Sequence, residues 1–197
     1  MKLTKRNHVS LNENERKKTE DRMQEQALIK RLREGDPGAV DDLVDEYKKP
    51  VFAFILRLVN DHYLAEDLFQ ETWIKVIRYI KSFRGDSKLS TWLFQIALNQ
   101  CRDTMRKKKY IHVPLEEAEN IAGSTTPDAE HIFVADEVRK IVAELPLKMK
   151  EVVVLKYFHD LHDKEISQIT GIPSGTVNSR LHRASDIMRK KWTLRNK

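Results

Sequence analysis

The stretch Glu165–Ala184, EISQITGIPSGTVNSRLHRA, joins two short helical patterns through an abrupt turn. Gly171 suits the left-handed backbone position that ends a helix, because glycine has no Cβ. Pro173 cannot continue the first helix, and Ser174 can cap the second. We therefore predict two helices fixed at a steep angle around a small shared core, with Asp163 capping the first of them.

The second helix has one apolar face and one polar face. Its apolar residues recur at spacings of four, three and four: Val177, Leu181, Ala184 and Met188. Its outward side chains are hydroxyl, amide or basic groups: Ser174, Thr176, Asn178, Ser179, Arg180, His182 and Arg183. From the major groove such groups reach base edges and phosphates. The pattern favours a DNA-binding helix-turn-helix, although a helical hairpin with a solvated polar face has the same local pattern.

Composition supports a polyanion partner and a helical fold. The chain has 197 residues, a net charge of +6 and only six glycines and six prolines. A basic balance suits nucleic acid but also suits a merely soluble protein. Cys101 is the only cysteine, which excludes an intrachain disulfide, and we expect it to be a buried thiol in a reducing cytoplasm. No apolar run approaches the roughly 20 residues of a membrane span, and no signal-peptide core is present.

Helical periodicity continues along the rest of the chain, without an alternating strand pattern. A first helix is expected from Ala27 to Glu34, followed by Asp36 as a cap and Pro37 at the start of the next helix. That second pattern runs to Val59 with Pro50 as a candidate kink.

Two further helices are expected before the composition changes. One covers Tyr63–Lys81, and the next is capped by Ser90 or Thr91 and ends near Lys108. An acidic, turn-rich segment follows without a Lys or Arg between Tyr110 and Val138. We predict an all-α protein of two small domains joined by a flexible acidic linker, with a helix-turn-helix in the C-terminal domain. The expected divisions are an N-terminal extension that is disordered or frays (1–24), a first domain (25–111), the linker (112–131) and a second domain (132–197).

Three motifs in this order resemble the sigma factors of bacterial RNA polymerase. They are DHYLAEDLFQETWIKV, FRGDSKLSTWLFQIALNQCRD and the EISQITGIPSGTVNSRLHRA stretch. More narrowly, the chain resembles the extracytoplasmic-function group of the sigma-70 family, and the resemblance covers roughly residues 26–192. It implies a region 2 domain followed by a region 4 domain.

The resemblance implies a role for each motif. The first motif would dock on core RNA polymerase through Asp67, Gln70, Glu71 and Trp73. Without the resemblance, that motif could equally be a solvated acidic face with a core Trp. The second motif would recognise and help melt the −10 promoter element through Phe83, Arg84, Lys88, Gln95, Asn99, Arg102 and Arg106. Trp92 is ambiguous there between core packing and base contact, and core packing is favoured.

The outward residues of the C-terminal helix would read the −35 element as duplex DNA. Asn178 and His182 depart from the Arg and aromatic residues often found at those positions, which leaves the bases read open. The resemblance further implies a monomer that binds and does not catalyse, that needs no cofactor, and that is held inactive by an anti-sigma factor of the kind often bound to a membrane. The acidic linker would thread toward the RNA-exit channel, and a flexible spacer explains the same composition.

Other functions have weaker support in the sequence. His159, Asp160, His162 and Asp163 could suggest a metal site, but such a group at a helix end is usually a solvated turn. No phosphate-binding loop or nucleophile motif indicates an enzyme. A helix-turn-helix regulator that binds DNA by itself as a dimer is the main alternative, and a protein-interaction module without a DNA role is a third.

Overall fold

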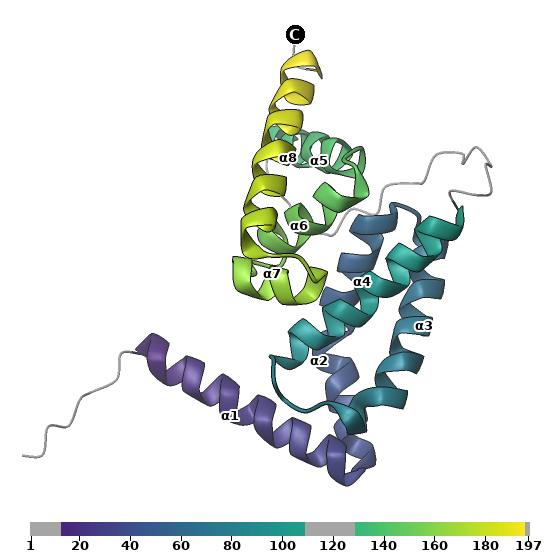
Figure 1. Cartoon of the computed structure of the whole chain (residues 1–197), viewed down its shortest axis with the longest axis vertical. Coiled ribbons are helices and arrows are strands. Elements are labelled where there is room, and N and C mark those ends of the chain that lie inside the picture. Colours follow the sequence, from purple (N-terminus) through teal and green to yellow (C-terminus); the bar gives the residue numbers. More distant parts are fainter. Residues whose placement is uncertain (1–12, 109–128, 196–197) are drawn as a thin grey trace, which may run out of the picture.

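The computed structural model describes residues 13–108 and 129–195, and every regular element in those ranges is helical (Figure 1). In chain order the elements are α1 (Glu13–Glu34), α2 (Pro37–Val59), α3 (His62–Tyr79), the 3-10 turn η1 (Ile80–Ser82), α4 (Leu89–Lys108), α5 (Ala129–Ala143), α6 (Leu147–Tyr157), α7 (Asp163–Thr170) and α8 (Ser174–Arg195). The predicted all-α class is confirmed, and the predicted linker falls mostly outside the described residues.

The N-terminal domain is a three-helix bundle with a fourth helix across its base. Helices α2, α3 and α4 pack against one another in pairs, and α1 packs against α2 and η1 at the lower end in Figure 1. The core contains fully buried aliphatic and aromatic side chains such as Phe54, Leu58, Val76 and Leu93. Cys101 lies in the same core as predicted, where burial raises the pKa of its thiol to about 12.

Short polar residues define the helix ends in this domain, largely as predicted. The Asp36 carboxylate accepts a hydrogen bond from the Gly38 N–H at 3.0 Å, and Pro37 begins α2. Asn60 ends α2 with a left-handed φ of 53°, and Asp61 then caps α3 by accepting from the Leu64 N–H at 3.0 Å. Pro50 lies inside α2, which continues through it to Val59, so the helix does not break at this candidate kink.

Two N-terminal boundaries differ from the prediction. Helix α1 begins at Glu13 instead of Ala27, because residues 13–24 are rich in strong helix formers that make no apolar stripe. Helix α4 begins at Leu89 and is not capped by Ser90 or Thr91. Instead, the carboxylate of Glu25 on α1 accepts the hydrogen bond of the Leu89 N–H. A cap supplied from a distant helix leaves no local sequence signal.

The C-terminal domain contains the predicted helix-turn-helix. Gly171 ends α7 with a φ of 73°, and its N–H donates to the Ser167 carbonyl at 2.9 Å. Beyond the turn, α8 packs on α7 and α6 through a buried core that includes Ile166, Ile169 and Val177. The predicted cap at Asp163 is wrong: Asp163 is the first residue of α7, and its carboxylate accepts from Lys156 at 2.9 Å.

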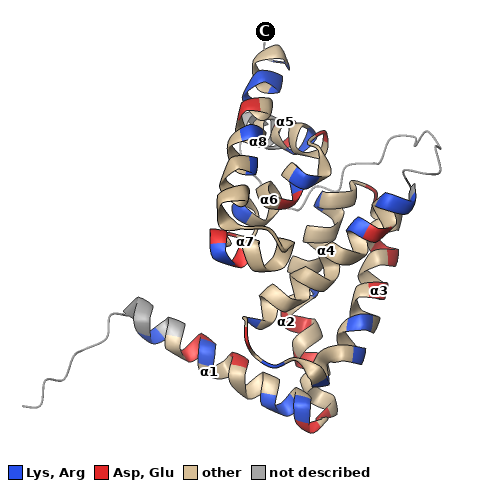
Figure 2. Cartoon of the chain, viewed as in Figure 1, with Lys and Arg blue, Asp and Glu red and all other residues tan. Residues whose placement is uncertain are grey.

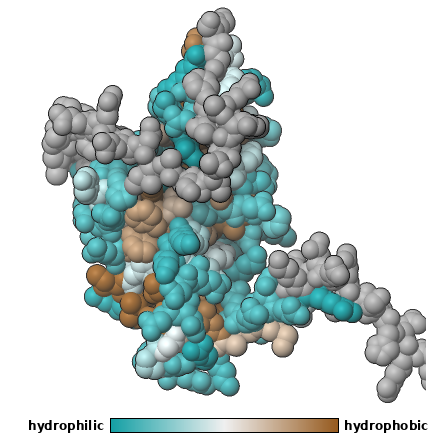
Figure 3. Space-filling model, turned by 180° about the vertical axis from the view of Figure 1, so that it is seen from behind, coloured by the Kyte–Doolittle hydropathy of each residue, from teal (hydrophilic) through white to brown (hydrophobic). Residues whose placement is uncertain are grey.

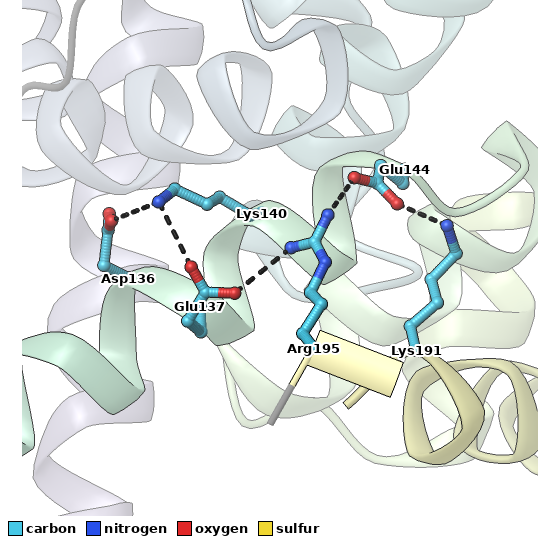
Figure 4. A network of polar contacts seen from close by, with 6 residues as sticks. All are labelled: Asp136, Glu137, Lys140, Glu144, Lys191 and Arg195. Carbon is cyan, nitrogen blue, oxygen red and sulfur yellow. Dashed lines mark hydrogen bonds and ion pairs between the residues drawn. The ribbon is translucent and has the colours of Figure 1, made fainter. Parts of the chain in front are cut away.

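Ion pairs tie the first helix of this domain to the end of the last (Figure 4). Lys140 pairs with Asp136 at 3.0 Å and with Glu137 at 3.2 Å on its own helix α5. Glu137 also pairs with Arg195 of α8 at 3.3 Å, and Glu144 pairs with both Arg195 and Lys191. Exposed pairs are individually weak, but a network of this kind restrains the direction of α8.

We expect Gly171→Ala to lower the free energy of unfolding by about 1 kcal/mol, because alanine is strained at this positive φ although its Cβ would meet open space. Urea unfolding followed by circular dichroism measures the change. Gly175→Ala is the matched control, since Gly175 lies inside α8 with open space around it and without a positive φ. That variant should be neutral or slightly stabilising. Equal effects at both glycines would contradict the role of the left-handed turn.

Candidate nucleic-acid interface

The first turns of α8 present the predicted polar side chains to solvent. Asn178, Ser179, His182 and Arg183 are exposed, and Ser174, Thr176 and Arg180 are partly exposed. Arg180 also donates to the Lys148 carbonyl at 3.4 Å, which directs its guanidinium toward the start of α6. Unpaired N–H groups at the helix start favour the approach of phosphates, and the exposed amide, imidazole and guanidinium groups can reach base edges.

Basic residues recur along α8 beyond these turns, as Figure 2 shows. Asp186 is the only acid that follows Gly175 in the sequence. The helix therefore combines an uncharged, hydrogen-bonding start with a basic remainder, which is the charge distribution expected of a helix lying on a duplex.

The loop between η1 and α4 is fastened from α1. Arg33 of α1 donates from Nε and Nη2 to the Phe83 carbonyl, at 3.0 and 2.5 Å. The Phe83 side chain is only 6% exposed and packs against Trp92 with ring centroids 5.2 Å apart. The prediction that Phe83 contacts DNA is therefore corrected: Phe83 anchors the loop, whereas Arg84 is exposed.

Helix α4 carries the remaining predicted −10 residues along one face. Gln95, Asn99 and Arg106 are exposed to solvent. Arg102 is half-buried and directs its guanidinium toward the C-terminal domain, where Nε and Nη2 donate to Glu151 at 2.8 and 2.7 Å. Lys88, just before α4, pairs with Glu165 at 2.6 Å. The structure therefore brings these residues to one face, where Gln95, Asn99 and Arg106 are accessible and Arg102 and Lys88 are paired with acids of the C-terminal domain.

Helix α3 presents a mixed polar and apolar face. Asp67, Gln70 and Glu71 are exposed as predicted. Trp73 is 7% exposed and packs against Phe69, so the aromatic anchor proposed for this face is a core residue. Its place on the surface is taken by Ile74 and Ile77, which are exposed beside the acidic residues. Figure 3 shows apolar side chains reaching the surface among hydrophilic ones when the molecule is seen from behind.

Sequence analysis missed two polar residues that organise these faces. Gln100 of α4 is buried, donates to the Glu71 carboxylate at 2.7 Å and accepts from Lys75, so it links the faces of α3 and α4. Glu151 is 1% exposed and lies in α6 directly before the apolar run Val152–Leu155. An acid in this position was a usable signal, because buried carboxylates need a cationic or hydrogen-bonding partner.

His159 lies at the contact between the two domains. Its ring centroid is 5.6 Å from that of Phe54 and 4.7 Å from that of Phe94, both in the N-terminal domain. Its Nε2 is buried without a hydrogen-bond partner among the described residues. Within the described ranges no group of His, Cys, Asp and Glu has the arrangement of a metal site, and His159 packs as an aromatic residue.

Both domains match the same family in sequence comparisons. Residues 43–110 match Sigma-70 region 2, and residues 135–186 match Sigma-70 region 4. A sigma factor of Bacillus subtilis, ECF RNA polymerase sigma factor SigW, is 34% identical over 175 residues, which cover 83% of this chain and 94% of SigW. The chain belongs to the extracytoplasmic-function sigma factors of the sigma-70 family. Its two domains are therefore region 2 and region 4.

Other relatives and solved structures agree with this family. The RNA polymerase sigma-H factor of Pseudomonas aeruginosa is 32% identical over 85% of this chain and 93% of its own length. The sigma factor RpoE of Bartonella quintana, solved in complex with the anti-sigma factor NepR, superposes with a TM-score of 0.65 at 25% identity, over 78% of this chain and 96% of RpoE. CnrH, solved with the cytosolic domain of CnrY, has a TM-score of 0.66 at 19% identity over 86% of this chain and 97% of CnrH, and supports the fold. No described helix is long and apolar enough to cross a membrane.

The structure predicts a pH dependence at the contact between regions 2 and 4. Burial, and secondarily the nearby Arg57, lowers the pKa of His159 from 6.5 to about 4. Because the unfolded chain binds the proton more readily, this contact is fully stable above pH 6.5 and weakens as the pH falls toward 4. Between pH 7 and pH 5 the loss amounts to at most about 2 kcal/mol.

Thermal unfolding at the two pH values tests this expectation. The natural chain should lose more stability at the lower pH than a His159→Gln variant, which cannot titrate at this position. The comparison cancels the contributions of the carboxylates, which the two proteins share. Equal losses in both proteins would assign the pH dependence to other groups.

Proposed function

We propose that this chain is an alternative sigma factor that binds core RNA polymerase and directs initiation at promoters with suitable −35 and −10 elements. The observation that carries the proposal is the pairing of region 2 with a region 4 whose recognition helix α8 exposes Asn178, His182 and Arg183. The function is binding and strand opening, so we assign no catalytic residue to the chain.

Docking on core polymerase is assigned to the exposed face of α3. Asp67, Gln70 and Glu71 supply the polar part of this face, and Ile74 and Ile77 supply the apolar part. Protein interfaces combine an apolar centre with a polar rim, and this arrangement fits that requirement better than the buried Trp73 does. Gln100 supports the proposal because its amide holds the Glu71 carboxylate in one orientation.

Recognition of the −10 element is assigned to the loop before α4 and to the outer face of that helix. A base extruded from the duplex costs a few kcal/mol to unstack, and the protein must offset this cost with stacking and hydrogen bonds. Arg84, Gln95, Asn99 and Arg106 are exposed and have suitable groups, and Lys88 and Arg102 add positive charge. Trp92, which is partly exposed behind Phe83, remains a packing residue in this assignment.

Region 4 would place α8 in the major groove of the −35 element. The uncharged start of α8 approaches the phosphates, and the basic remainder adds affinity that depends on salt. Each phosphate contact steepens the slope of log K against the logarithm of the salt concentration by about 0.9.

Region 4 also has an apolar groove of about 410 Å³ between α5, α6 and α8, lined by residues including Val142, Leu181 and Trp192. We assign this groove to protein contacts, since exposed apolar surface of this kind marks interaction sites.

The proposed function also implies where the chain acts, in which oligomeric state and with which partner. We place the chain in the cytoplasm, where polymerase and promoters are found, and expect it to act as a monomer within the holoenzyme. We also propose an anti-sigma factor as a partner, because RpoE of Bartonella quintana was solved with the anti-sigma factor NepR and superposes on this chain. The acidic linker lies mostly outside the described residues and stays a prediction as a spacer or nucleic-acid mimic.

Transcription in vitro tests the proposed function directly. Purified core polymerase, a library of bacterial promoter fragments and this chain should yield transcripts that are absent without the chain. Mapping their 5′ ends gives the −35 and −10 sequences. Tight binding of a palindrome by the chain alone as a dimer would instead favour an independent regulator, and an absence of new transcripts would contradict the proposal.

We expect Asn99→Ala to impair promoter opening more than closed-complex binding, because Asn99 lies on the exposed face assigned to the unpaired strand. Permanganate footprinting of thymines in the −10 element measures opening, and a gel shift of the holoenzyme measures binding. Thr104→Ala, a change at a partly exposed residue of α4 that is not assigned to DNA, is the control. An open complex as abundant as that of the natural chain would remove Asn99 from the assigned site.

We expect Arg183→Gln to weaken holoenzyme binding to the −35 element by about tenfold, since a charge-assisted contact to a base or phosphate contributes about 1–3 kcal/mol. Arg189→Gln makes the same charge change on α8 at another exposed residue and should have a smaller effect. Competition gel shifts with promoters altered only in the −35 element measure the difference. Equal losses would indicate a general charge effect without a specific contact at Arg183.

A further inference from the structure

Helix α1 holds the backbone of the loop between η1 and α4 at both of its ends. At the first end, Arg33 donates from Nε and Nη2 to the Phe83 carbonyl, at 3.0 and 2.5 Å. At the other end, the Glu25 carboxylate accepts from the Leu89 N–H, where α4 begins. Each contact is a hydrogen bond between a charged side chain and a backbone atom, and such bonds are stronger than neutral ones.

The two residues that make these contacts lie on one face of α1. Glu25 and Arg33 are eight residues apart, with Ile29 halfway between them, and residues four apart follow one side of a helix. At 1.5 Å per residue, this spacing spans roughly 12 Å along α1. One helix therefore sets the positions of both ends of the loop at once.

Helix α1 is itself fixed to the bundle, so it can act as a rigid support. Leu28 and Leu32 are buried in the hydrophobic core that the helices share. Near its end, Arg31 donates to the carboxylates of Asp36 at 2.7 Å and Asp42 at 2.6 Å, which ties α1 to the start of α2. Moving Arg33 or Glu25 would mean moving α1 on that core (Figure 1).

Between its two held ends, the loop turns sharply and exposes its side chains. Gly85 has a φ of 79°, in the left-handed region that suits glycine. A Cβ at Gly85 would lie 3.9 Å from Nη2 of Arg33, so the turn is next to the guanidinium. Arg84 and Asp86, on either side of the turn, are exposed to solvent.

We propose that Arg33 and Glu25 are positioning residues for the −10 element: they hold the loop in the shape that receives the unpaired strand, and they do so without touching DNA. This role rests on the assignment of the loop to the −10 element under the proposed function, and it adds two residues of α1 that determine the specificity of that site. A loop that already has its binding shape loses less conformational entropy when the strand arrives.

The opposite charges of the two residues separate positioning from direct contact with DNA. Arg33 is exposed and could bind a phosphate itself, in which case its loss would lower the salt slope of the affinity by about 0.9. Glu25 would repel the strand if it acted directly, so its loss would raise the affinity. Positioning predicts instead that the loss of either residue lowers the affinity for the −10 strand and leaves the salt slope unchanged.

Holoenzymes that contain the Arg33→Gln or the Glu25→Ala chain provide the first test. Fluorescence anisotropy with a labelled −10 non-template oligonucleotide, from a promoter used in the transcription assay, measures the affinity at several salt concentrations. We expect about a fivefold loss in each variant, because a loop with one free end would keep its binding shape for about a fifth of the time. A tighter complex with Glu25→Ala, or a lower salt slope with Arg33→Gln, would overturn the proposal.

Matched controls come from the same helix. Lys30→Gln and Glu20→Ala make the same charge changes at other exposed residues of α1. Both variants should bind the oligonucleotide with the affinity of the natural holoenzyme. Losses as large as those of Arg33→Gln and Glu25→Ala would assign the effect to the charge of α1 as a whole and would contradict the positioning role.

Base discrimination provides a second test, because a general loss of stability would not change it. The ratio of the affinities for the natural oligonucleotide and for one with a single changed −10 base should fall toward one in Arg33→Gln and Glu25→Ala. Glu25→Gln should keep most of this ratio, because its amide oxygen can still accept from the Leu89 N–H. Ratios equal to that of the natural holoenzyme in both of the first variants would overturn the proposal.

Amide exchange in the natural chain tests the contact at Leu89 even if a variant does not fold. The N–H groups at the start of a helix have no partner within the helix and need one from elsewhere. Nuclear magnetic resonance should show that the Leu89 N–H exchanges at least about tenfold more slowly than an amide of an unstructured peptide. Exchange at the unstructured rate would mean that Glu25 does not hold the loop.

The outcomes separate the positioning role from the proposed function. If the natural holoenzyme initiates but Arg33→Gln and Glu25→Ala bind the oligonucleotide with natural affinity and discrimination, the positioning role is wrong and the sigma function stands. If the natural holoenzyme initiates at no promoter, the proposed function fails, and the −10 role of the loop fails with it.

Discussion

A guanidinium that is withdrawn from water at the junction of two domains needs an anionic or carbonyl partner there, because it stays charged at any physiological pH. Arg102 is such a group: it is half-buried on α4 and is held by the carboxylate of Glu151 and the carbonyl of Thr170. Its partner decides how regions 2 and 4 lie with respect to each other. Three other features belong to the same contact between the regions as this pair: the packing of α7 on α4, the burial of Lys150 and the position of His159.

The helices that we propose for polymerase contact and for strand contact, α3 and α4, share a buried amide. Gln100 lies on α4 next to Asn99, and its side chain joins Glu71 and Lys75 of α3. A shift of α3 on docking would therefore be felt at α4 through hydrogen bonds as well as through packing. Coupling through a chain of this kind requires direct contacts, and here each contact is present in the described residues.

The sequence predicted the helices and the helix-turn-helix well, because Gly171, Pro173, Asp36 and Pro37 act locally on the backbone. Individual side chains were harder to place. Trp73 and Phe83 lie at positions where an aromatic residue can either cover the core or face a partner, and periodicity does not distinguish these cases. Glu25 and Arg102 depend on contacts between distant segments, so no local pattern reports these contacts.

The loop before α4 is held at both ends by groups that touch only its backbone. Arg33 binds the Phe83 carbonyl and Glu25 binds the Leu89 N–H, while Arg84 and Asp86 between them are exposed. The loop can therefore keep its shape when its exposed side chains change. With the −10 role proposed for this loop, new promoter preferences can evolve, or be engineered by exchanging a few loop residues, without rebuilding the domain that displays them.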